Sequence, residues 1–160
     1  MRQQLGALDS LAIRTCSLVG SRTLHFGVGV VYVWFGVLKY FPQASPAEDL
    51  IGKTVSWAVN PEWFIPLLAT WELAIGLGFL TGRFPRLTLA LFFLHMPGTF
   101  MPMIVCPELV WTEFPHSWTL EGQYIVKNLV LIGAGLTLAG QLQPRPPTAH
   151  ANEVSAGAGV

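Results

Sequence analysis

Four long apolar stretches are the feature that most limits how this chain can fold. Each is close to the roughly 20 residues that an α-helix needs to cross a hydrocarbon core of about 30 Å. Charged residues make up only 11% of the 160-residue sequence, against about 25% in soluble domains. We therefore predict an all-α integral membrane protein, a bundle of four transmembrane helices. The expected spans are residues 24–41, 63–82, 87–106 and 123–142.

The four spans form one domain, residues 24–142, flanked by an N-terminal segment of residues 1–23 and a tail of residues 143–160. The tail is rich in Pro, Ala and Gly and shows no apolar periodicity. Such a composition cannot bury enough apolar surface to offset the loss of chain entropy on folding. We expect the tail to be disordered.

The connection between the first two spans contains a helix-start pattern. Ser45 is followed by Pro46, which suits the first helical position, and by Glu48, which stands three residues after Ser45 as in a capping box. Apolar residues then recur at helical spacing. We predict a short helix over about residues 46–59 that lies along the membrane surface.

The basic residues predict the orientation, because Lys and Arg in short connections are retained on the cytoplasmic side. One side of the predicted membrane carries nearly all of them, and the other side has only Lys53 outside the spans. Both termini are therefore expected in the cytoplasm, in a multi-pass protein of the cytoplasmic (plasma) membrane whose first partner is the lipid bilayer. The cytoplasmic set is Arg2, Arg14, Arg22, Arg83, Arg86 and Arg145.

Ionisable side chains inside the predicted spans are the main candidates for function. Lys39, Glu72, His95 and Lys127 each lie within an apolar stretch. A charge near the centre of a bilayer costs on the order of 2.5–3.5 kcal/mol on insertion scales, so these groups need partners. They suit either an internal ion-pair network or a site for an anionic or carbonyl-bearing ligand.

Helical periodicity places further polar groups beside these four. Tyr32 lies on the same stripe of the first helix as Lys39, and Asn128 adjoins Lys127 on the fourth. Lys39 and Lys127 are near enough to the outer interface to act as plain anchors, and His95 can equally be a packed histidine bonded within its helix. The ligand-binding candidates are Lys39, Glu72, His95, Lys127, Asn128 and Tyr32.

The third span contains Pro97, Gly98 and Pro102 close to His95. A proline inside a helix removes an amide donor and clashes with the carbonyl four residues before it. We predict a kink beside His95. Broken helices at membrane depth often line a cavity, although proline kinks without function are also common.

Composition disfavours several classes of function. Nine Lys and Arg balance nine Asp and Glu, so the chain lacks the basic excess that binds nucleic acid. Cys16 and Cys106 stand far apart without a metal-ligand or dithiol spacing, which argues against a zinc, dithiol or disulfide centre. Haem is disfavoured because His25 and His95 should differ in depth by roughly 9 Å. We predict no metal site, and no resident cofactor is visible in the sequence.

Three motifs stand in order along the predicted spans: Gly36-x-x-Lys39, Glu72-x-x-x-Gly76-x-Gly78-x-Leu80-x-Gly82 and Lys127-Asn128. In these motifs the chain resembles the DoxX-like superfamily of small four-helix membrane proteins over about residues 20–142. The resemblance implies a four-helix bundle in the cytoplasmic membrane. Relatives of this kind include the DoxD-type subunit of thiosulfate:quinone oxidoreductase and proteins linked to oxidative stress.

Two main interpretations of function stay open. In the first, the chain is a membrane subunit of a redox or oxidative-stress system and holds a quinone or small anion among its buried charges. A redox partner protein must then bring the electrons, so the chain is at most a subunit of a quinone-linked oxidoreductase. In the second, it is a non-enzymatic scaffold or accessory subunit, with or without self-association, and its charges only fix helix packing. A small transporter is a third, less favoured interpretation.

Overall fold

The computed structural model describes residues 2–144, and the remainder of the predicted tail lies outside the described residues. Within that range four helical regions are long and apolar enough to cross a membrane: Leu8–Leu38, Pro61–Thr81, Pro85–Val105 and Leu120–Gly140. The helices and strands, in chain order, are α1 (Arg2–Leu38), α2 (Glu48–Val55), α3 (Pro61–Thr81), α4 (Pro85–Phe100), α5 (Pro102–Val105), α6 (Pro107–Val110), β1 (Trp111–Glu113), β2 (Ser117–Trp118) and α7 (Leu120–Gly140).

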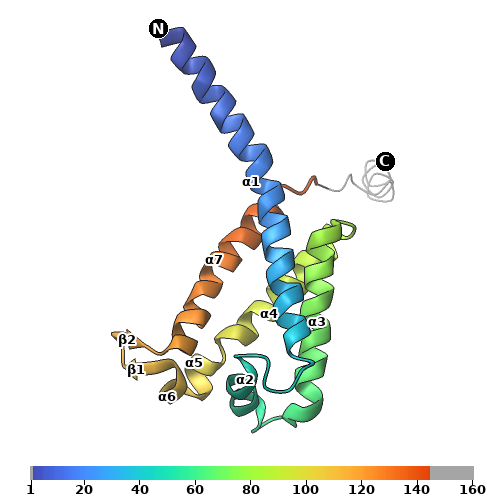
Figure 1. Ribbon diagram of the computed structural model, residues 1–160, viewed down its shortest axis with the longest axis vertical. Helices are drawn as coiled ribbons and strands as arrows, with labels where there is room; N and C mark the ends of the chain where they lie inside the picture. The colour runs from blue at the N-terminus through green and yellow to red at the C-terminus, as the bar shows by residue number, and fades with distance from the viewer. Residues whose placement is uncertain (1, 145–160) are drawn as a thin grey trace, which may run out of the picture.

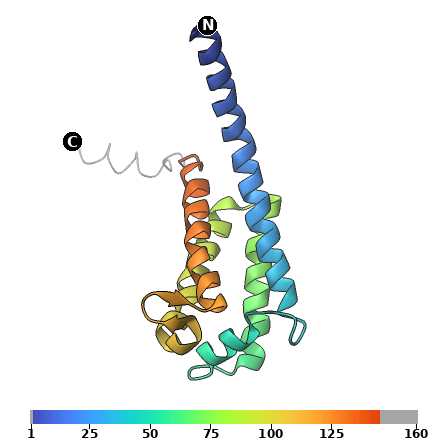
Figure 2. The same ribbon diagram turned by 60° about the vertical axis from the view of Figure 1, so that its left-hand side comes forward.

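The long helices α1, α3, α4 and α7 form the body of the molecule (Figures 1 and 2). α1 runs beside α3, while α4 packs between α3 and α7. The short elements α2, α5, α6 and the β1–β2 hairpin gather at the end opposite the N-terminus. This hairpin is the one departure from the predicted all-α fold among the described residues, and it pairs Trp111 with Trp118.

Helix α1 differs most from the prediction. It was expected to span residues 24–41, but it begins at Arg2 and ends at Leu38. Residues 8–20 of it are exposed, and both views show this part projecting beyond the other helices. Residues 2–23 of the predicted N-terminal segment, which was given as residues 1–23, are therefore a continuation of the first helix rather than a separate element. The other three spans agree with the prediction to within three residues at each end.

Glycines bring α1 and α3 into close contact. A Cβ added to Gly76 would lie 2.7 Å from the backbone nitrogen of Val33 and 2.9 Å from the carbonyl oxygen of Gly29. A Cβ on Gly36 would lie 3.2 Å from the carbonyl oxygen of Ala69. Small residues allow backbones to approach in this way, and the contact fixes the register between the two helices.

Aromatic and aliphatic side chains fill the space between α1, α3, α4 and α7. Phe92 and Ile75 are fully buried at its centre. Glycines also permit close packing here, since Gly135 of α7 abuts Phe92 and Gly78 of α3 abuts Thr88 of α4. The outward faces of the same helices expose large apolar side chains such as Val130, which is 73% exposed. This pattern is expected where lipid covers the outer surface.

The predicted surface helix exists but is shorter, α2 rather than residues 46–59. The predicted capping box was wrong. No side chain caps α2, and the buried hydroxyl of Ser45 has no hydrogen-bond partner among the described residues. Glu48 does reach back, but its carboxylate accepts a hydrogen bond from the backbone N–H of Gln43, 2.7 Å away. Glu48 therefore binds the backbone N–H two residues before Ser45, the residue that the capping-box pattern indicates.

The third span is interrupted between Phe100 and Pro102, and Pro102 is one of the three residues at which a kink was expected. α4 continues through Pro97 and Gly98 and ends at Phe100, and α5 begins at Pro102. The carbonyl of Gly98 has no donor four residues later, because Pro102 has no N–H. It accepts instead from the N–H of Met101 at 3.2 Å. The chain thus changes from one helix to the next without leaving this carbonyl unpaired.

Candidate functional site

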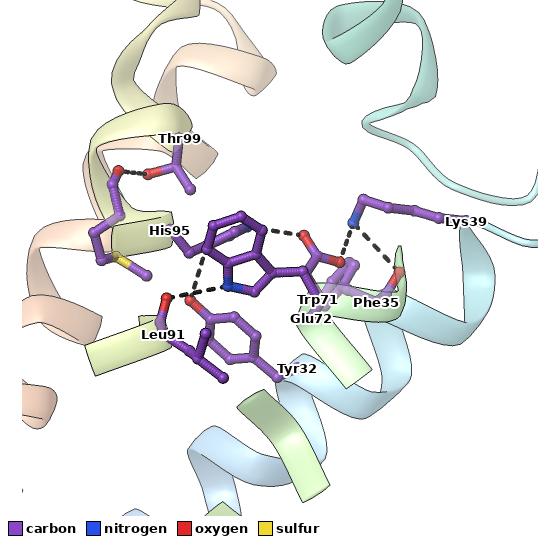
Figure 3. Close-up of polar contacts among 9 residues, drawn as sticks. Tyr32, Phe35, Lys39, Trp71, Glu72, Leu91, His95 and Thr99 are labelled. Atoms are coloured by element: carbon purple, nitrogen blue, oxygen red, sulfur yellow. Dashed lines mark hydrogen bonds and ion pairs between the residues drawn. The ribbon is translucent and has the colours of Figure 1, made fainter. Parts of the chain in front are cut away.

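Glu72 is the centre of a buried polar cluster that joins three helices (Figure 3). Its Oε2 accepts a hydrogen bond from Nζ of Lys39, at 2.6 Å, and its Oε1 lies 3.4 Å from Nε2 of His95. Only 10% of the Glu72 side chain is exposed, and 4% of the Lys39 side chain. In such a setting an unpaired carboxylate is very costly, and a paired one is tolerated because each oxygen has a partner.

Lys39 is placed by the end of α1. It lies one residue beyond the helix, and its ammonium also donates to the carbonyl of Phe35 at 3.4 Å. The last carbonyls of a helix have no intrahelical donor and carry the negative end of the helix dipole, so a cation is favoured there. Lys39 therefore joins the end of α1 to the middle of α3 and still has a third N–H available.

Tyr32 and His95 extend the cluster toward the middle of the bundle. The Tyr32 hydroxyl lies 3.3 Å from Nδ1 of His95, and the two rings meet edge to face with centroids 5.6 Å apart. His95 thus uses both ring nitrogens, one toward a phenol and one toward the Glu72 carboxylate. Both links, and those of Lys39, are drawn as dashed lines in Figure 3.

Aromatic side chains surround the histidine. The indole of Trp71 packs beside the His95 ring and donates its N–H to the carbonyl of Leu91 at 3.2 Å. Phe92 packs against Tyr32 with ring centroids 5.7 Å apart. These contacts hold the polar groups in an apolar shell, which strengthens electrostatic interactions inside it.

The four polar residues form one continuous chain, Lys39 to Glu72 to His95 to Tyr32. Its ends are seven residues apart in the sequence, Tyr32 on α1 and Lys39 just beyond it, a separation of roughly 10 Å along the helix axis. An ammonium, a carboxylate, an imidazole and a phenol can each hold or give up a proton. Lys39 has one N–H beyond its two hydrogen bonds, and the four groups stand in an order along which a proton can pass from one to the next.

Two of the candidates lie outside this cluster. Lys127 is exposed, with its ammonium 5.0 Å from the centre of the Tyr124 ring on the same helix. Its neighbour Asn128 is half-buried and forms no hydrogen bond with Glu72 or His95 among the described residues. The buried face of α7 consists instead of small and apolar residues: Gly122, Ile125, Ala134, Gly135 and Leu138.

Sequence reasoning missed the role of Trp71. An indole in a membrane span signals no particular partner, whereas the Leu91 carbonyl that it contacts belongs to another helix. Thr99, one turn beyond His95, donates to the carbonyl of Met96 at 2.7 Å. Within residues 2–144 no three His, Cys, Asp or Glu side chains lie close enough to hold a metal ion.

Comparison with protein-family models, curated proteins and solved structures finds no match for this chain. The resemblance to DoxX-like proteins therefore stays a prediction from the motifs.

Proposed function

We propose that this chain is a DoxX-like membrane subunit of a redox or oxidative-stress system, and that the Lys39–Glu72–His95–Tyr32 chain is its polar site. The proposed ligand is a quinone carbonyl or a small anion, held by the Lys39 ammonium. The observation that supports this most is the unbroken contact of four titratable side chains from three helices, nearly all buried. Ionisable groups at such a place in membrane proteins commonly mark substrate or proton pathways.

Each residue has a distinct part in the proposal. Lys39 donates to the ligand oxygen, and Glu72 holds the ammonium in place at 2.6 Å. His95 lies between the Glu72 carboxylate and the Tyr32 hydroxyl, so it can accept a proton from one side and release it to the other. Reduction of a quinone takes up two electrons and two protons. In this proposal the chain handles protons and a separate partner protein supplies the electrons.

The scaffold interpretation is the second candidate, and a specific observation favours it. Both oxygens of Glu72 and both nitrogens of His95 already have protein partners. In this second candidate the paired groups have the single role of fixing the register of α1, α3 and α4, as buried polar groups do in some helical assemblies. The two candidates differ in whether a ligand accompanies the protein.

The test is native mass spectrometry of the detergent-purified protein, followed by quinone extraction from the same sample. The variants are Glu72→Gln and Lys39→Met, with Lys127→Met as the matched control because Lys127 is exposed and outside the cluster. We expect stoichiometric quinone with wild type and Lys127→Met, and its loss from both cluster variants.

Absence of any small molecule from wild type, together with a protein partner that stays bound in every variant, would reject the ligand site. That result would favour the scaffold. Equal loss of quinone from Lys127→Met would also count against the proposal, since it would show non-specific dependence on charge.

A further inference from the structure

A groove lies between α1 and the end of α3, at the point where α1 leaves the other helices. Its cavity has a volume of about 290 Å³. An adjoining cavity of about 180 Å³ shares His25, Phe79 and Gly82 with it and extends between α4 and α7. These residues are separate from the Lys39–Glu72–His95–Tyr32 chain. The wall of the groove that faces outward is formed by Arg22, Phe26, Leu80 and Thr81.

The groove is cationic at one end. Arg22 is exposed and lines the cavity, and its guanidinium has no hydrogen-bond or ion-pair partner among residues 2–144. His25 lies one turn further along α1. Its Nδ1 is 3.1 Å from the carbonyl oxygen of Ser21, which can only accept a hydrogen bond. Nδ1 therefore carries the proton of this contact, and Nε2 is left for another group.

The rest of the groove is apolar and open. Phe26 is 65% exposed and Leu80 is 40% exposed, both on helices apolar enough to cross a membrane. A Cβ added to Gly27 or to Gly82 would meet no atom within 4 Å, so space is free beside both. A guanidinium beside an open apolar wall matches a molecule with an anionic head and a hydrocarbon tail.

We propose that this groove binds one anionic phospholipid. The lipid phosphate pairs with the guanidinium of Arg22, whose planar donor fork suits phosphate oxygens, and His25 lies within the same cavity. An acyl chain lies along Phe26 and Leu80. The apolar wall favours a lipid over free phosphate, and three further arginines of the same predicted membrane side, Arg14, Arg83 and Arg86, are consistent with an anionic leaflet.

The test is native mass spectrometry of the full chain in detergent, titrated with phosphatidylglycerol and phosphatidylcholine of identical acyl chains. The variants are Arg22→Gln and, as the matched control, Arg14→Gln, which removes the same charge from an exposed site on the same helix. We expect about a tenfold loss of phosphatidylglycerol affinity for Arg22→Gln, as for loss of a charge-assisted contact, and less than about a twofold loss for Arg14→Gln. Wild type should bind phosphatidylcholine weakly.

Two further arms separate the parts of the proposal. Phe26→Ala should weaken phosphatidylglycerol binding while Arg22 is intact, and added inorganic phosphate should not displace the lipid. Equal losses for Arg22→Gln and Arg14→Gln would overturn the site, because they would show diffuse attraction. Equal binding of the two lipids, or displacement by phosphate, would overturn it as well. Arg14, Arg22 and Phe26 are all exposed, so the melting temperatures of the three variants should match wild type.

Discussion

At the residue scale, the Lys39–Glu72 pair determines how the cluster responds to mutation. Glu72→Gln removes the charge that faces the Lys39 ammonium at 2.6 Å and leaves a buried cation without its partner. Loss of one partner from a buried pair costs about 3–5 kcal/mol. We expect Glu72→Gln to lower the melting temperature in detergent strongly, and the double variant with Lys39→Met to recover much of the loss.

The two single variants and the double variant form a thermodynamic cycle that measures the coupling energy between Lys39 and Glu72. Lys127→Met is the control, since an exposed lysine outside the cluster should change stability by less than about 0.5 kcal/mol. If the double variant is as unstable as Glu72→Gln alone, the two side chains are not coupled and the pair seen here is not the source of the effect.

Tyr32 offers a milder change in the same chain. Tyr32→Phe removes the hydroxyl that lies 3.3 Å from Nδ1 of His95 and keeps the ring against Phe92. One net hydrogen bond is worth about 1 kcal/mol, so thermal unfolding should show a small loss of stability. A loss of stability as large as that of Glu72→Gln would show that the hydroxyl contributes more than one ordinary hydrogen bond.

The stripe that carries Lys39, Tyr32 and Val28 could be read from the sequence, because steps of three and four residues return to one face of a helix, and all three are buried. The same spacing puts Glu72 on a face with Ala69 and Phe79, and all three are buried. For Lys127 the sequence left the bundle and the interface as alternatives, and the side chain is exposed. A lysine near the end of a span can face the interface instead of the bundle, and only the partner helices decide which.

At the scale of elements, the contact between α1 and α3 depends on glycine. Gly76→Ala would place its Cβ 2.7 Å from the backbone nitrogen of Val33, so the two helices must move apart. Overpacking of this kind costs roughly 1–3 kcal/mol. We expect a lower melting temperature and, because the register of Lys39 over Glu72 depends on this contact, weaker coupling in the Lys39–Glu72 cycle.

Gly133→Ala in α7 is the matched control. An added Cβ there meets nothing within 4 Å, and alanine favours a helix over glycine by about 1 kcal/mol. The melting temperature of the Gly133→Ala variant should be unchanged or slightly higher than that of wild type. If both substitutions destabilise the protein equally, close packing at Gly76 is not the cause.

The predicted element boundaries are accurate where Pro, Gly or a capping residue stands at the observed end of a helix. α3 begins at Pro61 after an Asn60 cap and ends before Gly82, which has a positive φ of 61°. They were predicted poorly where local signals compete with tertiary contacts. Ser45 looks like a cap but is buried, and α1 continues to Arg2 because its N-terminal half contains no helix breaker beyond single glycines.

At the scale of the whole molecule, the remaining prediction concerns orientation in the membrane. The arginines predict that the N-terminal part of α1 is cytoplasmic and that α2 faces outward. In a Cys106→Ala background, Cys16 is the single cysteine, and it is exposed. A membrane-impermeant maleimide added to intact cells should therefore leave Cys16 unlabelled until the membrane is permeabilised.

The matching variant carries Cys16→Ser, Cys106→Ala and Ser56→Cys, which puts one cysteine at an exposed position just after α2. Intact cells should label it at once. The reverse pattern would place α2 in the cytoplasm. It would also move the Arg22 groove to the outer leaflet and turn the Lys39 end of the cluster toward the cytoplasm. The direction in which the Lys39–Glu72–His95–Tyr32 chain can exchange protons thus depends on the same measurement.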